Sequence, residues 1–282
     1  MKLLFCGVRG STPAAGSDFA RVGGNTSCVA LMRGAGPPTL VLDAGTGLRR
    51  LSGVLAGDPF RGTILLTHLH WDHTQGLPFF AAGDRDDAHV TLVMPAQGDP
   101  AEVLARALSP PHFPIGPDGL RGDWCFRGLE PGEHELEDFA VFAEEIPHKG
   151  GRTFGYRISD GEEAIAYLPD HGPLTAGPGP DGVGARHDAA LTLCRGVDVL
   201  VHGAQFTTDE RERAADYGHA TVDYAVALAR EAGVGRLVLF HHDPSRVDDE
   251  VDAIAAKAAA SASIPVTAAV EGSTVLVGEP TA

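Results

Sequence analysis

The sequence lacks a long apolar run, and its cysteines are few. No hydrophobic stretch among the 282 residues approaches the roughly 18 that are needed to span a membrane. The apolar start at residues 1–9 is interrupted too soon for a secretory signal and is typical of a first strand. The four cysteines are far apart and form no C-x-x-C pair: Cys6, Cys28, Cys125 and Cys194. These features predict a cytoplasmic protein with reduced thiols and no membrane partner.

Positive charge is also scarce. The 22 basic residues include three lysines and are outnumbered by 38 acidic residues, which gives a formal net charge of −16. Nucleic-acid-binding proteins usually carry a basic patch, because much of their affinity comes from neutralising phosphates. No run rich in lysine or arginine is present, so the charge balance disfavours a long polyanion without excluding it. A small anionic substrate is disfavoured much less.

Apolar residues make up 43% of the chain and are spread along it, which is typical of one globular domain over residues 1–282. Short β-like runs recur in both halves, at residues 2–8, 27–33, 39–43, 63–67, 89–94, 139–146, 153–158, 164–168, 197–202, 236–240, 265–269 and 273–277. Helices are expected at residues 74–82, 100–108, 221–232 and 246–260. Strands mixed with helices predict an α/β fold in which two packed sheets are flanked by helices.

Two segments rich in glycine and proline are expected to be irregular. Residues 109–133 also carry several aromatic side chains. A lid, a packed loop and the surface of a possible homodimer are therefore all open interpretations. Residues 172–184 are expected to form a flexible loop beside a functional site, because strand-like segments resume after them.

The chain does contain a dense group of metal-binding side chains. His68, His70, Asp72 and His73 have the spacing H-x-H-x-D-H and follow the apolar run 64–66. Residues i and i+2 of an extended chain point to the same side, so His68 and His70 can bind one ion. Asp72 and His73 can face a second ion once the chain turns. Imidazole and carboxylate ligands favour Zn²⁺, with Mn²⁺ and Fe²⁺ as alternatives. A polar surface loop with chance histidines is the competing interpretation.

This motif resembles the signature of the metallo-β-lactamase superfamily, and the resemblance covers nearly the whole chain. Segments 7–13, 23–28 and 43–47 resemble the opening motifs of the branch that contains cyclic phosphodiesterases and ribonuclease Z. The later motifs follow in the family's order: His148, Asp170, the G-H-A-T segment 218–221 and the F-H-H-D-P segment 240–244. The resemblance implies an αβ/βα sandwich, with two mixed sheets flanked by helices and a metal site along one edge.

The resemblance also implies two divalent metal ions that share one ligand, Asp170. The first ion would be bound by His68, His70, His148 and Asp170. The second ion would be bound by Asp72, His73, Asp170 and His241.

Neighbouring residues have supporting or structural roles in this interpretation. Alignment on the apolar run 237–240 selects His241 as the ligand, so His242 would point the other way. Asp43 would steady the metal-binding loop without touching an ion. Histidines that follow strands are interpreted as structural: His171 and His202. The remaining histidines are interpreted as surface residues: His89, His112, His134 and His187.

Two residues are predicted to take part in catalysis. His219 lies in a segment that resembles the G-H-S-T element of the phosphodiesterase branch, where the histidine stabilises charge or protonates the leaving oxygen. Its alternative role is that of a helix-capping residue. Asp72 would help to orient the attacking hydroxide. One departure from the family pattern is Gly203, which stands after the strand-like run 197–201 where the family commonly has a carboxylate.

The predicted function is hydrolysis of a small or cyclic phosphodiester by a dinuclear metal-dependent enzyme. The nearest alternative is a tRNA 3′-end endonuclease of the ribonuclease Z type, which would need a basic arm that is not visible in the sequence. A lactonase, thioesterase or β-lactamase on the same fold would leave the G-H-A-T segment unexplained. A catalytically silent metal-binding module is the alternative from outside the enzymes.

Overall fold

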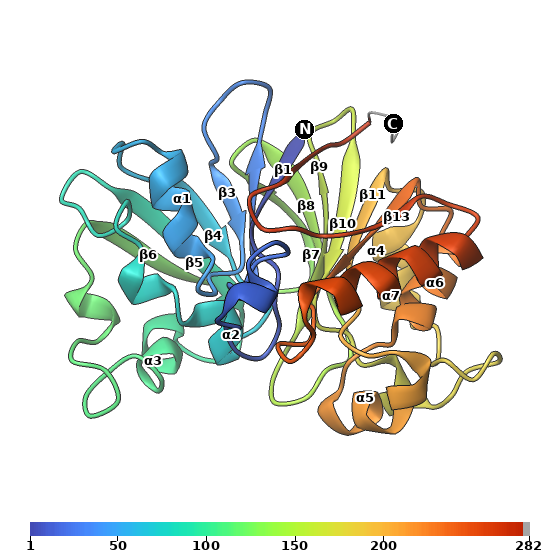
Figure 1. The fold of residues 1–282 in the computed structure, drawn as a ribbon. Helices are drawn as coiled ribbons and strands as arrows, with labels where there is room; N and C mark the ends of the chain where they lie inside the picture. Colours follow the sequence, from blue (N-terminus) through green and yellow to red (C-terminus); the bar gives the residue numbers. More distant parts are fainter. Residues whose placement is uncertain (279–282) are drawn as a thin grey trace.

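The computed structural model describes residues 1–278, which form two seven-stranded sheets packed face to face (Figure 1). The first sheet contains, in order across it, β14 (Thr274–Leu276), β1 (Lys2–Gly7), β2 (Cys28–Met32), β3 (Leu40–Leu42), β4 (Arg61–Leu65), β5 (His89–Pro95) and β6 (Asp123–Leu129). The second contains β13 (Val266–Ala268), β12 (Arg236–Phe240), β11 (Val199–Gly203), β10 (Ala164–Leu168), β9 (Phe154–Ser159), β8 (Phe139–Glu145) and β7 (Gly132–Leu136).

An apolar core between the sheets contains side chains from both halves of the chain. Phe5 of β1 lies against Phe240 of β12, with ring centroids 6.0 Å apart, and Phe240 also contacts Tyr167 of β10. These residues are buried in one cluster with Val29 and Tyr156. Alternate residues of a strand point to one face, so each sheet contributes every second side chain to this core.

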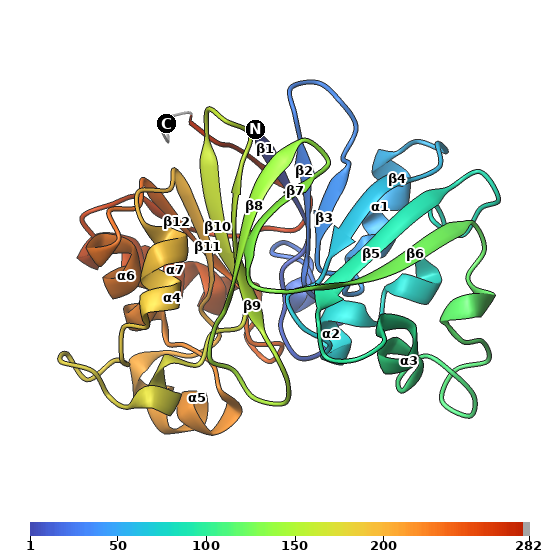
Figure 2. The ribbon, with the colours of Figure 1, turned by 180° about the vertical axis from the view of Figure 1, so that it is seen from behind.

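Helices cover the outer faces of both sheets (Figures 1 and 2). On the side of the first sheet these are α1 (Leu48–Val54), α2 (Trp71–Thr74) and α3 (Pro100–Ala105). On the side of the second sheet they are α4 (Asp188–Cys194), α5 (Arg211–Tyr217), α6 (Val222–Glu231) and α7 (Asp248–Ser261). The predicted α/β sandwich of two mixed sheets flanked by helices is confirmed. Within residues 1–278, no helix combines the length and the apolar character required to cross a membrane.

The two best-marked helices agree with their sequence signals. α6 begins after Thr221, whose hydroxyl accepts a hydrogen bond from the Tyr224 amide at 3.3 Å, and Gly233 follows its end in a left-handed conformation. α7 begins with three acidic residues, which suit the positive end of a helix. The helix expected at residues 74–82 is wrong, because only a short 3₁₀ turn, η2 (Leu77–Phe79), forms there. Gly76 and Pro78 interrupt the pattern.

The expectation that all of 109–133 is irregular is also wrong. β6 pairs in parallel with β5, and β7 pairs with β8 across a tight turn. Both are strands at the edges of their sheets, so only alternate side chains, such as Trp124 and Phe126, are partly buried. The prolines of residues 110–117 suggested an irregular segment, and the weak alternation that follows them was therefore missed. The short helices α1, α4 and α5 were likewise not expected.

The direction of the strands brings both halves of the chain to one edge. β3 and β4 are parallel to each other, as are β10, β11 and β12. Carboxyl ends of parallel strands open at the same edge of a sheet, where ligand sites of α/β proteins form. Asp43 follows β3, Asp170 follows β10 and His241 follows β12. The packing of the two sheets therefore places functional groups from distant parts of the sequence beside one another.

Candidate metal centre

The loop after β4 presents its histidines and carboxylate to two different places. Leu66, Thr67 and His68 continue from the strand as buried residues. His70 is still extended and stands just before α2, whose first residues are Trp71, Asp72 and His73. The change from extended to helical backbone turns Asp72 and His73 away from the direction of His68 and His70. A short helix thus divides one hexapeptide between two groups of side chains.

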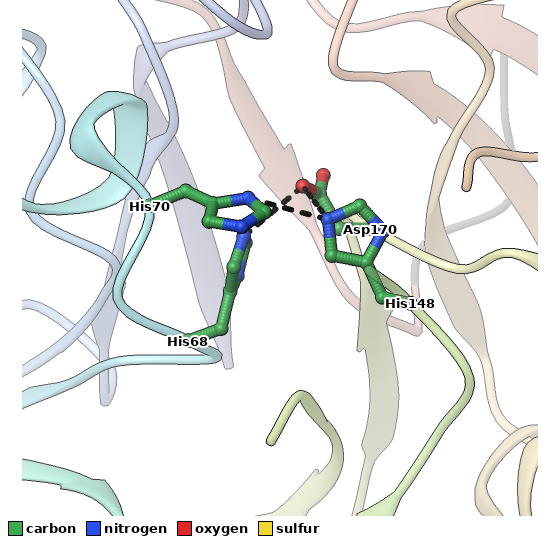
Figure 3. A group of neighbouring side chains, drawn as sticks. All are labelled: His68, His70, His148 and Asp170. Carbon is green, nitrogen blue, oxygen red and sulfur yellow. Dashed lines mark hydrogen bonds and ion pairs between the residues drawn. The ribbon is translucent and has the colours of Figure 1, made fainter. Parts of the chain in front are cut away.

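The first group joins the hexapeptide to residues that follow β8 and β10 (Figure 3). Nε2 of His148 lies 3.3 Å from Nδ1 of His70. One carboxylate oxygen, Oδ2 of Asp170, lies 3.3 Å from Nε2 of His68 and 3.3 Å from Nε2 of His148. The potential ligand atoms of all four residues lie within 4.8 Å of one another: His68, His70, His148 and Asp170.

The second group shares Asp170 with the first. Nε2 of His241 lies 2.9 Å from Oδ1 of Asp170 and 3.1 Å from Oδ2 of Asp72. It also lies 3.4 Å from Nε2 of His73. These ligand atoms again lie within 4.8 Å of one another: Asp72, His73, Asp170 and His241. The structure therefore brings together all seven residues that the sequence suggested as ligands, in the two predicted groups.

The donor set fits divalent metal ions. Nε2 of His68 and Oδ1 of Asp170 are buried and accept or donate no well-oriented hydrogen bond within residues 1–278. Leaving such atoms unpaired is costly in a protein interior. A divalent cation between these nitrogen and oxygen atoms would satisfy them and would offset the buried carboxylate charge. Imidazole and carboxylate ligands in groups of four suit Zn²⁺ well.

The charges within the site favour cation binding. Burial by itself raises the pKa of Asp72 and of Asp170, but the nearby histidines hold both pKa values well below the usual range. Burial also opposes protonation of His241, yet the same two carboxylates raise its pKa to about 9. Burial lowers the pKa of three other histidines, which favours the neutral form that binds metals: His68, His70 and His148.

Asp43 holds His73 in position from outside the ligand groups. Its Oδ2 lies 2.8 Å from Nδ1 of His73, which leaves Nε2 facing the second group. The same carboxylate accepts hydrogen bonds from the Thr67 amide at 2.8 Å and the Tyr167 hydroxyl at 2.9 Å. Asp43 has a positive φ of 59°, an uncommon conformation for a residue other than glycine. Backbone strain of this kind concentrates at functional sites.

Other ligand candidates are oriented in the same way. Nδ1 of His148 donates to the Gly218 carbonyl at 2.6 Å, and Nδ1 of His241 lies 3.1 Å from Oε1 of Gln205. Nδ1 of His68 lies 3.1 Å from the Thr67 hydroxyl. In each case Nδ1 contacts a neighbouring group, and Nε2 faces the ligand group. Such partners fix the tautomer and the ring orientation of metal-binding histidines.

His219 lies between the two groups on a loop that joins α5 to α6. Its ring centroid is 5.0 Å from that of His148 and 5.3 Å from that of His241. Its side chain makes no hydrogen bond within residues 1–278, and burial lowers its pKa to about 3. Thr221, rather than His219, caps α6. The imidazole is therefore neutral, and its ring nitrogens are available to a bound molecule.

Gly203 has no room for the carboxylate that the family pattern commonly places there. A Cβ atom at Gly203 would lie 1.9 Å from the carbonyl oxygen of Pro169. Two residues later, Gln205 reaches the site instead and contacts His241. No carboxylate within residues 1–278 forms a hydrogen bond with His219; its ring is instead positioned by packing against His148, His241 and Phe206, whose ring centroid is 5.9 Å away.

The remaining histidines lie outside both groups. His242 is buried and its Nε2 lies 3.0 Å from the Ala269 carbonyl, so it points away from the site as expected. His171 and His202 are buried and share a hydrogen bond of 3.2 Å, which agrees with a structural role. The surface assignment of His187 is wrong, because its ring packs against His171 and its Nε2 is buried.

Sequence reasoning missed several residues that support the site. Thr67 and Tyr167 hold Asp43, and Gln205 contacts His241. The backbone amide of Ser11 donates to Oδ2 of Asp72 at 2.6 Å. Thr67 stands immediately before the hexapeptide, and Ser11 lies in the opening motif. Their positions in or beside the motifs could have indicated a role at the site, whereas Tyr167 lies in an ordinary strand sequence.

A two-sheet sandwich with seven converging histidines and aspartates at one edge defines a metal-dependent hydrolase of the metallo-β-lactamase fold. The profile of the family described as "Beta-lactamase superfamily domain" matches residues 39–242. Ribonuclease Z of Lacticaseibacillus casei (strain BL23) is 31% identical over 236 residues, which cover 71% of this chain and 74% of that protein. The chain belongs to the β-lactamase superfamily.

Solved structures show the same fold. The metallo-β-lactamase fold protein YhfI from Bacillus subtilis superposes with a TM-score of 0.72 at 20% identity, over 98% of this chain and 99% of YhfI. Zn²⁺-bound PqqB from Methylobacterium extorquens superposes with a TM-score of 0.70 at 19% identity, over 98% of this chain and 100% of PqqB.

Proposed function

We propose that the protein is a dinuclear metal-dependent phosphodiesterase that hydrolyses small or cyclic phosphodiesters. The observation that carries the proposal is the sharing of Asp170 between two complete groups of ligand candidates, with His219 facing both. His68, His70 and His148 would complete one metal site with Asp170. Asp72, His73 and His241 would complete the other. Zinc is the proposed ion, on the ligand chemistry and because the structurally similar PqqB binds Zn²⁺.

Two residues would act directly on the reacting groups. Divalent ions held by these residues would supply an activated water and would polarise phosphoryl oxygens. Asp72 Oδ2, which is fixed by the Ser11 amide, would orient the attacking water opposite the leaving oxygen. His219 is kept neutral by burial, so its N–H would stabilise the negative charge that develops on the leaving oxygen. A single donor of this kind typically contributes roughly 10²–10³ in kcat.

The charge of the chain supports a small substrate. A net charge of −16 would repel a long polyanion outside the metal site, while the site itself would attract one phosphodiester. Lys149, one of three lysines, already hydrogen-bonds the Asp216 carbonyl. Small diesters, including cyclic ones, match this arrangement better than structured RNA does.

Ribonuclease activity is the second candidate, because a curated relative that is 31% identical is a ribonuclease Z. On this alternative the same residues would cleave near the 3′ end of a precursor tRNA. The charge balance is the observation that places it second.

A substrate panel tests the proposal. Zinc-loaded protein is assayed with bis(p-nitrophenyl) phosphate, a 2′,3′-cyclic nucleotide, a precursor tRNA, a lactone and a thioester. The proposal expects turnover of the two small diesters and weaker cleavage of the tRNA. Efficient tRNA cleavage would favour the ribonuclease alternative. Turnover of the lactone or the thioester without any diester hydrolysis would contradict the proposal.

A further inference from the structure

A groove on the side of the first sheet is lined in part by α2, the helix that also carries Asp72 and His73. It has a volume of about 450 Å³, which is in the range of sites for small molecules. Its walls come from α2, η2, α3 and the segment that follows α3. The residues that define this aromatic groove are Trp71, Phe79, Leu104, Arg106, His112 and Phe113.

The aromatic groove exposes large apolar rings to solvent. The Trp71 side chain is 75% exposed and that of Phe79 is 58% exposed. Phe79 and Phe113 meet edge to face, with ring centroids 5.8 Å apart. Leu104 is buried behind them as part of the apolar core. Exposed aromatic surface gathered in one hollow is unfavourable in water and commonly marks a binding site.

The groove begins at the metal-binding motif itself. Trp71 stands between His70 and Asp72, one from each ligand group, so its backbone is fixed by the same loop. α3 lies beside α2 in both views of the molecule (Figures 1 and 2). The groove and the second ligand group therefore share one short helix, α2, which carries Trp71 together with Asp72 and His73.

Polar and charged groups line the same groove. Arg106 and His112 are exposed, and neither side chain makes an ion pair or hydrogen bond within residues 1–278. Arg106 therefore adds a positive charge to a groove that is also lined by Trp71, Phe79 and Phe113. A guanidinium can stack on a planar ring or donate hydrogen bonds to its edge. A purely alkyl ligand would use neither property.

We propose that the aromatic groove binds the nucleobase of a small phosphodiester substrate. The base stacks on Trp71 and is enclosed by Phe79 and Phe113, while Arg106 and His112 contact its polar edge or a second phosphate. Stacking of bases on aromatic side chains needs no particular sequence and suits a small nucleotide. This inference rests on the proposed phosphodiesterase function, and it narrows the substrate class to nucleotides.

Fluorescence of Trp71 tests the proposal without requiring turnover. The chain has two tryptophans, so Trp124→Phe leaves Trp71 as the sole reporter. This protein, zinc-loaded and again after removal of metal, is titrated with adenosine 5′-monophosphate, ribose 5-phosphate and butyl phosphate. The adenine compound is expected to quench the fluorescence saturably and to bind at least about tenfold more tightly than ribose 5-phosphate in the loaded protein.

Variants of the groove locate the interaction. Phe113→Leu and Phe79→Leu should each weaken binding of the adenine compound by about tenfold and leave ribose 5-phosphate unaffected. Phe142→Leu is the matched control, because Phe142 is also partly buried but lies on β8 outside the groove. Its binding and diester turnover should be unchanged.

Three results would overturn the inference. The first is equal affinity for the adenine and ribose phosphates, and the second is a higher affinity for butyl phosphate than for the adenine compound. The third is a dimer in analytical ultracentrifugation together with Trp71 fluorescence that shows the indole to be shielded from solvent. Each of these can occur while bis(p-nitrophenyl) phosphate is still hydrolysed, in which case only the groove assignment fails. Conversely, saturable binding of the adenine compound without any diester hydrolysis would refute the proposed function and leave the groove assignment standing.

Discussion

Asp43 Oδ2 lies 2.8 Å from His73 Nδ1, and both side chains are completely buried. Burial lowers the pKa of His73, yet Asp43, together with Asp72 and Asp170, raises it well above the usual value. The Asp43 carboxylate therefore stabilises positive charge on His73, and because it lies beside Nδ1 it leaves Nε2 facing the second ligand group. Asp43 lies in the loop that follows β3, whereas His73 belongs to α2, so the contact joins two elements at the metal centre.

The first prediction concerns this pair. Asp43→Asn keeps the shape of the side chain but removes the charge that orients His73. Affinity for the more weakly bound metal ion should fall by about 10–100-fold, as is typical for partners of metal-binding histidines. Titration with a chromophoric chelator measures the affinity, and circular dichroism verifies the fold. Tyr167→Phe, which removes one hydrogen bond to Asp43, should have a smaller effect. An unchanged affinity in Asp43→Asn would show that the pair has no part in metal binding.

The second prediction separates two adjacent histidines. His241 faces both carboxylates of the second group, while His242 contacts the Ala269 carbonyl. His241→Ala should therefore lose metal and diester turnover, and His242→Ala should keep most of the metal. Elemental analysis of both variants decides the matter. Loss of metal in His242→Ala alone would mean that the register of β12 is misassigned.

The third prediction concerns His219. Its ring faces both ligand groups without a hydrogen bond of its own within residues 1–278. His219→Ala should lower kcat for bis(p-nitrophenyl) phosphate by roughly 10²–10³-fold, with metal content and KM little changed. His134→Ala, far from the site on β7, serves as the control. Undiminished turnover in His219→Ala would remove this residue from the mechanism.

The fourth prediction is a dependence of stability on pH. Burial lowers the pKa of His202 to about 4, whereas an unfolded histidine titrates near ~6.5. Between these values the unfolded chain binds the proton more readily, so stability is present above pH 6.5 and is lost as the pH falls towards 4. Protonation of His202 in the unfolded chain should lower the free energy of unfolding by about 2 kcal/mol between pH 7.5 and pH 5.

Urea unfolding of metal-stripped protein at the two pH values measures this effect. His202→Gln should reduce the loss of unfolding free energy, while His112→Gln, at an exposed position, should not. An identical pH dependence in wild type and His202→Gln would show that His202 takes up its proton in the folded state.

Local patterns predicted much of this architecture. All twelve strand-like runs correspond to strands, and the central strands among them are buried and leave continuous apolar runs in the sequence. β6 and β7 were missed because they bury little more than alternate side chains, and a helix was wrongly expected at residues 74–82 because Gly76 and Pro78 were not weighed against the apolar residues. The assignment of one domain to residues 1–282 stays a prediction.

The site was predictable where its chemistry is concentrated. The spacing of the hexapeptide by itself indicates metal binding, and the later ligand candidates were predicted from the resemblance to a family. Contacts such as that of Tyr167 with Asp43 depend on packing between residues 124 positions apart, and no local pattern reports such a contact. The same is true of Gln205, which reaches His241 only because β11 and β12 are adjacent.

The fifth prediction tests the central claim, that Asp170 joins two metal sites into one hydrolytic centre. Native mass spectrometry of zinc-loaded wild type should show two ions per chain. Asp170→Asn should lose affinity for both, while His148→Ala should mainly lose one. Asp123→Asn, at an exposed carboxylate on β6, should still bind two. A single ion in fully loaded wild type, or two tightly held ions in Asp170→Asn, would contradict the account.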